Sequence, residues 1–160
     1  MIQRIQTVYF VLAFIVLSLS FVFPFASFDL SPDSILVLTK NGLLLNDVIV
    51  EGYVWSFSVS IFLSFILLAL LVVVFMFKKL NVQAILGKLF YVFLLGYILF
   101  LYMNSNELML FIQDTYKIEN VQLLYLYSFY APIVAVTFVF LANRGIKKDM
   151  DLLKSLDRLR

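Results

Sequence analysis

The sequence predicts an all-α membrane protein with four transmembrane helices, a short β-hairpin in the first outer loop and a C-terminal amphipathic cytoplasmic helix. Of its 160 residues, 64% are hydrophobic and 14% are charged, whereas a typical soluble domain is about 45–50% apolar and about 25% charged. A soluble fold of this length could not bury so much apolar surface. The chain has no Cys and no His, which removes thiol chemistry, imidazole bases and the commonest metal ligands. We therefore expect no cofactor, no metal site and no enzymatic activity.

Four long apolar runs predict the helices. They place spans at about residues 5–25, 53–77, 88–104 and 121–143, and the third is the shortest. A helix needs about 18–20 apolar residues to cross a hydrocarbon core roughly 30 Å thick. Helix is favoured because each backbone polar group in lipid must find its partner within its own segment or a closed barrel. We expect the first run to be an uncleaved span, since it exceeds the usual signal-peptide core of about 7–15 residues.

The distribution of Lys and Arg predicts the orientation of the chain. The termini and the second predicted loop carry ten basic residues, whereas the other two loops carry only Lys40 and Lys117. Basic loops remain on the cytoplasmic side. The predicted location is therefore the bacterial inner (cytoplasmic) membrane, crossed several times, with both termini in the cytoplasm. Tyr125, Tyr127 and Tyr130, at the outer end of the fourth run, suit an interfacial aromatic belt.

The first outer loop carries a hairpin pattern. Residues 33–50 read "DSILVLTKNGLLLNDVIV", with two aliphatic runs joined by Asn41-Gly42, and this dipeptide favours a type I′ turn. The alternative is an ordinary loop whose leucines dip into the interface. The second outer loop, residues 104–120, is acidic and is expected to continue a helix beyond the membrane surface.

Small residues and one proline indicate where helices pack. Gly52, Ser56, Ser60 and Ser64 recur at every fourth position of the second run, a spacing that lets helices approach closely. Packing within the bundle and a dimerisation face both remain open. Pro132 lies within the fourth run, where it is expected to kink the helix because it removes a backbone donor.

The end of the chain is unlike the rest. We divide the chain into a transmembrane domain, residues 1–145, and a cytoplasmic tail, residues 146–160, with a break at Gly145. At helical spacing the apolar residues of the tail share one half of the wheel and its charges lie opposite. An amphipathic basic helix is typical of a segment that binds anionic lipid. The candidate binding residues are Arg144, Ile146, Lys147, Lys148, Met150, Leu153, Lys154, Leu156, Arg158 and Arg160.

The partner of this tail is membrane lipid of the inner leaflet or, as an alternative, a membrane or cytoplasmic protein. No nucleic acid is expected, because Asp149, Asp151 and Asp157 offset the basic residues of the tail and no recognition fold accompanies them.

Both ends of the chain carry a family resemblance. The opening "MIQRIQTVYF", the closing "LANRGIKKD" and "DRLR", and the internal "FYAPIVAV" and "FMFKKLNVQ" resemble the bacterial domain-of-unknown-function 4293 family. The resemblance covers the whole chain. The chain departs from the family pattern at two places. It has Ala131 where the family favours Leu, and Phe77-Lys78-Lys79 where the family favours a more basic run. The resemblance implies a small four-span membrane protein without an assigned activity.

The predicted function is that of a non-enzymatic accessory or scaffold subunit that uses its tail to bind a partner or the inner leaflet. The alternative is a small transporter or channel for a neutral or lipidic substrate, because the apolar runs contain no ionisable residue that would serve a charged one.

Overall fold

The computed structural model describes residues 5–31, 34–39, 42–45, 48–49, 55–117 and 121–158. Within these ranges the chain forms helices and strands in a mixed order. The helices are α1 (Ile5–Leu19), α2 (Trp55–Phe75), the 3-10 turn η1 (Met76–Lys78), α3 (Leu80–Tyr116) and α4 (Tyr127–Arg158). The strands are β1 (Ala26–Ser31), β2 (Ser34–Thr39), β3 (Gly42–Leu45), β4 (Val48–Ile49) and β5 (Gln122–Tyr125).

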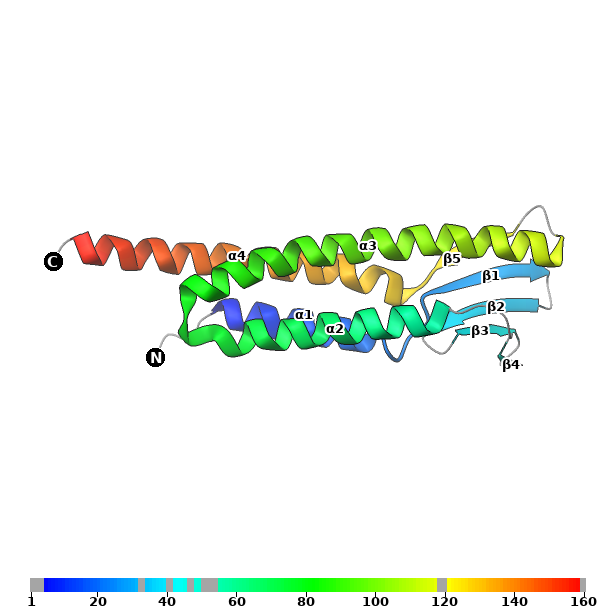
Figure 1. Cartoon of the computed structure of the whole chain (residues 1–160), viewed down its shortest axis with the longest axis horizontal. Helices are drawn as coiled ribbons and strands as arrows, with labels where there is room; N and C mark the ends of the chain where they lie inside the picture. The colour runs from blue at the N-terminus through cyan, green and yellow to red at the C-terminus, as the bar shows by residue number, and fades with distance from the viewer. Residues whose placement is uncertain are drawn as a thin grey trace.

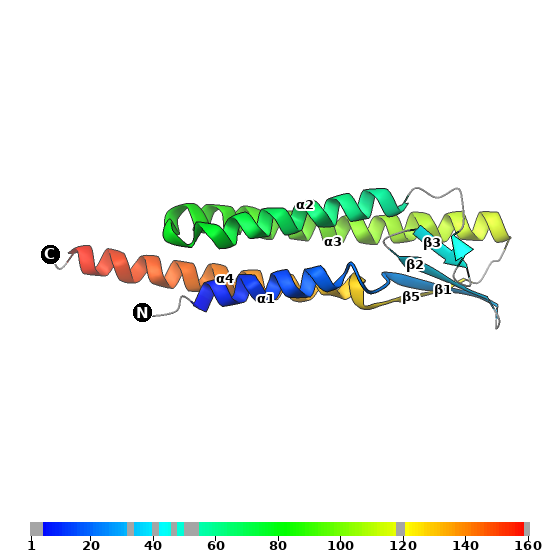
Figure 2. The same cartoon turned by 90° about the horizontal axis from the view of Figure 1, so that it is seen from below.

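The four α-helices run along the long axis of the molecule and alternate in direction, with the sheet at one end and both chain termini at the other (Figure 1). Seen from below, α2 and α3 form one layer, and α1 and α4 form the other (Figure 2). The most extensive helix contact joins α1 to α4, followed by that of α3 with α4. Helix α4 therefore connects the two layers.

Helix α3 differs most from its predicted span. It has 37 residues, Leu80–Tyr116, whereas the sequence predicted only residues 88–104. Lys88 and Glu107 are exposed on this helix, so their charges do not interrupt it. The expected continuation of the helix into the second outer loop is confirmed as far as Tyr116.

The strands form one antiparallel sheet in the order β4-β3-β2-β1-β5. The expected hairpin is present as β2 and β3. Thr39 pairs with Gly42, so Gly42 begins the second strand, whereas Asn41, the other residue of the predicted turn, lies outside the described residues. Gly42 has φ 126°, a conformation that favours glycine. The hairpin is thus only the middle of a larger sheet.

One face of the sheet is buried. Phe28 on β1 pairs with Leu36 on β2 and with Leu123 on β5, and both Phe28 and Leu36 are fully buried. Ile35, next to Leu36, and Leu124, next to Leu123, point to the opposite face and are exposed. The C-terminal half of α3 runs beside the sheet in both views (Figures 1 and 2), and it contributes Leu108 and Ile112 to the same core cluster.

Hydrogen bonds fasten the end of α1 to the start of α4. The Ser128 hydroxyl on α4 donates to the carbonyl oxygen of Phe23 at 2.6 Å and of Ser20 at 3.3 Å. The backbone N–H of Leu126 donates to the Phe25 oxygen at 2.9 Å. Carbonyls at a helix end lack partners within their own helix. Ser20 and Phe23 lie in the turn that follows α1, so Ser128 supplies a donor to that turn and ties it to α4.

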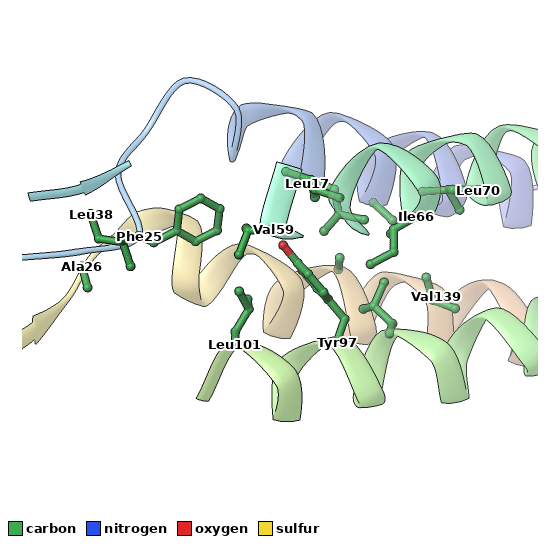
Figure 3. Close-up of a cluster of buried hydrophobic side chains, with 14 of the residues drawn as sticks. Leu17, Phe25, Ala26, Leu38, Val59, Ile66, Leu70, Tyr97, Leu101 and Val139 are labelled. Carbon is green, nitrogen blue, oxygen red and sulfur yellow. The ribbon is translucent and has the colours of Figure 1, made fainter. Parts of the chain in front are cut away.

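The helix interior is apolar apart from a few polar side chains. Phe10, Ala13 and Leu17 bury one face of α1. Tyr97 of α3 reaches across the interior, with its hydroxyl close to Val59 (Figure 3). The Tyr97 side chain is 1% exposed, and its hydroxyl has no hydrogen-bond partner among the described residues.

The prediction of an all-α protein with four transmembrane helices is wrong. Residues of the first outer loop and the start of the fourth predicted span form a five-stranded sheet. Among the described residues, two helices are long and apolar enough to cross a membrane, Leu80–Tyr116 and Tyr127–Ser155, whereas Ile5–Leu19 and Val59–Phe75 are shorter. At β5, inside the fourth predicted span, the prediction failed because a short apolar run does not distinguish a helix from a strand by periodicity alone.

Candidate functional site at the basic end of the helix bundle

Basic side chains gather where α4 leaves the helix bundle. Within α4 the first two apolar side chains after Gly145 turn inward: Ile146 is fully buried and Met150 packs on the core. The intervening charged residues are therefore held on the surface. The exposed basic residues that the structure describes at this end are Lys79 between η1 and α3, Lys88 on α3, and Arg144, Lys147, Lys148 and Lys154 on α4.

The expected break at Gly145 is absent, because α4 continues through it from Tyr127 to Arg158. Gly145 instead allows α1 to approach closely. A Cβ at this position would lie 3.4 Å from Cβ of Gln6, and small residues at helix contacts permit such an approach. The charged end of α4 is therefore a direct extension of a bundle helix.

A basic groove separates α3 from α4. It has a volume of about 490 Å³ and is lined by Ala84, Lys88, Phe140, Asn143, Arg144, Lys147, Met150, Asp151 and Lys154. Four of these side chains are cations and only Asp151 is an anion. Phe140, Ala84 and Met150 give the groove apolar walls. Within the described part of α4, Asp151 forms no ion pair with Lys147 or Lys154.

The opposite flank of α4 carries a second groove, against α1. Its volume is about 760 Å³, and its lining residues are Tyr9, Leu141, Arg144, Gly145, Lys147, Lys148, Asp151, Leu152 and Ser155. Arg144, Lys147 and Asp151 line both grooves. Lys148 belongs to this flank alone, which distinguishes the two sides of α4.

A layer of buried amides lies under the basic end. Asn143 Nδ2 of α4 donates to the Gly87 carbonyl of α3 at 3.0 Å, and Gln83 Nε2 of α3 donates to the Val73 carbonyl of α2 at 3.3 Å. Gln6 of α1 is fully buried, and neither of its side-chain polar atoms has a hydrogen-bond partner in the described part of the chain. Buried amides without partners are costly, and ordered water is their usual complement.

An apolar groove runs along the outer surface of α2 and α3. It has a volume of about 680 Å³ and is lined by Phe62, Lys88, Leu89, Val92, Phe93, Gly96, Tyr97 and Phe100. A Cβ at Gly96 would meet no atom within 4 Å, so this glycine leaves open space in the groove. Lys88 is shared with the basic groove. The two grooves therefore adjoin at one lysine.

The structure divides the predicted tail residues. Ile146 and Met150 pack in the bundle, whereas Leu153 is 51% exposed beside Lys154. The side chains of Leu156 and Arg158 and the whole of Arg160 lie outside the described residues. The apolar face predicted as continuous is thus split between the bundle and the surface.

Of the predicted packing residues, the structure describes the side chains of Ser60, Ser64 and Pro132. Ser60 is half-buried, whereas Ser64 is exposed and donates to the Ser60 carbonyl of its own helix at 2.8 Å. Gly52 and the side chain of Ser56 lie outside the described residues. Pro132 is buried in the second turn of α4, and Ser128 bonds the end of α1 rather than its own helix.

Sequence reasoning missed the contributions of Gly87, Asn143 and Lys88 to this end of the molecule. The sequence signal that could have indicated them was an amide side chain, Asn143, beside an apolar run. Amides in a helical bundle tend to hydrogen-bond to a neighbouring helix. The basic groove combines cationic hydrogen-bond donors with apolar walls. This combination suits a ligand that is both anionic and amphipathic.

The fold and this basic end define a small protein of four helices and one antiparallel sheet, two of whose described helices have the length and composition of membrane spans. A family model described as "Domain of unknown function (DUF4293)" matches residues 2–159, and the chain belongs to this family. A comparison with curated proteins gave no match.

Proposed function

We propose that this protein is a non-enzymatic accessory or scaffold subunit of the bacterial inner membrane, and that it docks a protein partner through the projecting end of α4. One observation carries the proposal: α4 is a single helix from the bundle interior to its charged end, Tyr127–Arg158. Because it does not turn at Gly145, its last turns continue along the bundle axis beyond the other helices (Figure 1).

The direction of α4 favours a protein over the membrane surface as the partner. A helix that lies on a leaflet must run in the membrane plane, whereas this one continues the direction of the bundle. Residues 151–155 are all exposed, and Leu152 and Leu153 are 54% and 51% exposed. Short helices without tertiary contacts are marginal in water, so a partner that covers these leucines would stabilise the projecting end.

The surface of the bundle supports a place in the membrane. Along α4, exposed tyrosines at 127 and 130 precede exposed Ile133, Val134 and Phe140, and the first basic residue is Arg144. The rise from Tyr127 to Arg144 is about 26 Å at 1.5 Å per residue, close to the roughly 30 Å of a hydrocarbon core. Tyrosines at one end and basic residues at the other match the aromatic belt and the cytoplasmic side.

Both termini lie at the basic end (Figure 1), which supports a cytoplasmic location for each. Lys88, Arg144 and Lys147 meet at that end. The sheet then belongs to the opposite, outer side of the membrane.

The experiment compares full-length protein with a version that ends at Met150. This end point retains Ile146 and Met150, which pack in the core, and removes the exposed turns. In-cell crosslinking and co-purification in mild detergent, read by mass spectrometry, should recover a stoichiometric protein with the full chain and lose it with the shortened one.

Point variants separate docking from helix truncation. The double variant Leu152→Ser/Leu153→Ser should lose the partner, whereas Leu152→Met/Leu153→Met, which keeps apolar helix-forming side chains, should retain it. Recovery of the same partner with all versions, or of no protein with any, would contradict the proposal.

A further inference from the structure

We propose that the basic groove and the apolar groove together bind one anionic phospholipid. Its phosphate lies among Lys88, Arg144 and Lys147, and one acyl chain follows α3 over Gly96. This inference rests on the proposed place of the bundle in a membrane and deepens it, because it names the lipid class and the residues that would select it.

The charge of the basic groove matches a phosphate headgroup. Four cations and one carboxylate line it, and basic pockets between helices on the cytoplasmic side are typical binding places for anionic headgroups. Arg144 offers a planar fork of donors that suits phosphate, and Lys88 and Lys147 offer mobile point charges. All three side chains are exposed, so a headgroup can reach them from the lipid.

The apolar groove matches an acyl chain. From Lys88 to Phe100 the helix rises about 18 Å at 1.5 Å per residue, slightly more than the roughly 15 Å of hydrocarbon in one leaflet. Leu89 and Val92 are 63% and 67% exposed, and the missing side chain at Gly96 leaves room beside them.

Two features favour a lipid over a soluble anion. Lys88 lines both grooves, so the cationic and apolar grooves adjoin at this side chain, within reach of the headgroup and one chain of a single lipid. The walls of the basic groove also include Phe140 and Met150, and a free phosphate ion would leave these side chains without an apolar contact.

The test titrates the full-length protein, purified in a neutral detergent, with dioleoyl phosphatidylglycerol and separately with dioleoyl phosphatidylcholine. Native mass spectrometry counts the bound lipids. We expect one phosphatidylglycerol to bind more tightly than phosphatidylcholine. Lys88→Gln and Arg144→Gln should each weaken it about fivefold, the effect of one cation near a membrane surface. Gly96→Phe should weaken both lipids by filling the apolar groove.

Matched variants serve as controls. Lys148→Gln removes a cation from the opposite flank of α4 and should change lipid binding by less than about twofold. Leu95→Phe adds an aromatic ring at an exposed position of α3 that does not line the apolar groove, and it should leave binding unchanged.

Three outcomes would overturn the inference. The first is equal affinity for the two lipids, and the second is an equal effect of Lys148→Gln and Lys88→Gln on that affinity. The third is competition by free glycerol phosphate when Gly96→Phe has no effect on lipid binding. The last outcome would assign the groove to a soluble phosphate compound.

The membrane proposal has its own readout. Resistance of the protein to alkaline carbonate extraction from cell membranes tests its insertion independently of lipid choice. A protein that resists extraction but shows no preference for phosphatidylglycerol contradicts only the lipid site, whereas a protein released by carbonate contradicts both proposals.

Discussion

The side chain of Asn143 on α4 donates a hydrogen bond to the carbonyl oxygen of Gly87 on α3, across 3.0 Å. A Cβ at Gly87 would overlap Oδ1 of the same asparagine. The contact therefore depends on an amide at one position and the absence of a side chain at the other. It joins the two helices of the described chain that have the length and composition of membrane spans.

Gly87→Ala should destabilise the bundle, and Gly96→Ala should not. Both variants make the same change on α3, and alanine gains about 1 kcal/mol of helix propensity over glycine. At Gly87 the new methyl displaces Asn143 and breaks its hydrogen bond, at a cost of about 1–3 kcal/mol. At Gly96 no atom lies within 4 Å. Denaturant unfolding in detergent, followed by circular dichroism, measures the difference, and equal stability of the two variants would contradict it.

Gln6→Leu should stabilise the protein. Gln6 is fully buried, and its two polar atoms have no partner among the described residues. A leucine of similar size removes a desolvation cost of about 1–3 kcal/mol. Gln83→Leu is the comparison, because it also removes the bond to Val73 and should therefore gain less. A loss of stability in Gln6→Leu would indicate that ordered water satisfies this amide.

Ser128→Ala should loosen the corner between α1 and β1. The hydroxyl is the donor for the Phe23 and Ser20 carbonyls, and leaving such acceptors without a partner costs about 1–3 kcal/mol. Proteolysis near residues 20–25 should accelerate, and the unfolding midpoint should fall. Ser155→Ala is the control: Ser155 is exposed and its hydroxyl bonds only its own helix, at Leu152, so its effect should stay within about 0.5 kcal/mol.

Gly42→Ala should destabilise the sheet end without affecting the helices. Gly42 has φ 126°, and a side chain in such a region costs about 1–3 kcal/mol. Hydrogen exchange should rise in β2 and β3 and remain unchanged in α4, because the strain falls on the hairpin alone. If exchange in β2 and β3 matched that of the unmodified protein, the hairpin would tolerate a side chain at position 42.

Reporter fusions should place the two ends of the molecule on opposite sides of the membrane. Green fluorescent protein fused after Arg160 should fluoresce, and alkaline phosphatase inserted between Lys40 and Asn41 should be active. The reason is the concentration of basic residues at the end of the termini. Exchanging the two reporters is the control and should silence both, whereas active phosphatase at the C-terminus would reverse the predicted orientation.

The amino-acid sequence by itself determined where helices would form and how charge would be distributed. The apolar runs were long enough to predict four helices, and each described helix includes part of its predicted range. The hairpin also followed from local information, because Gly42 supplies a conformation that few other residues adopt. These features depend on neighbours in the chain.

Only the tertiary structure decided how far the helices extend and what the outer segments become. Strand β1 pairs with β5, about a hundred residues away in the chain, and no local sequence pattern predicted that pairing. Helix α4 also continues through Gly145, where α1 approaches closely through Gln6. The long apolar runs were sufficient to predict helices, whereas partners distant in sequence decide whether a short apolar segment becomes a strand, how far each element extends and which surface it leaves exposed.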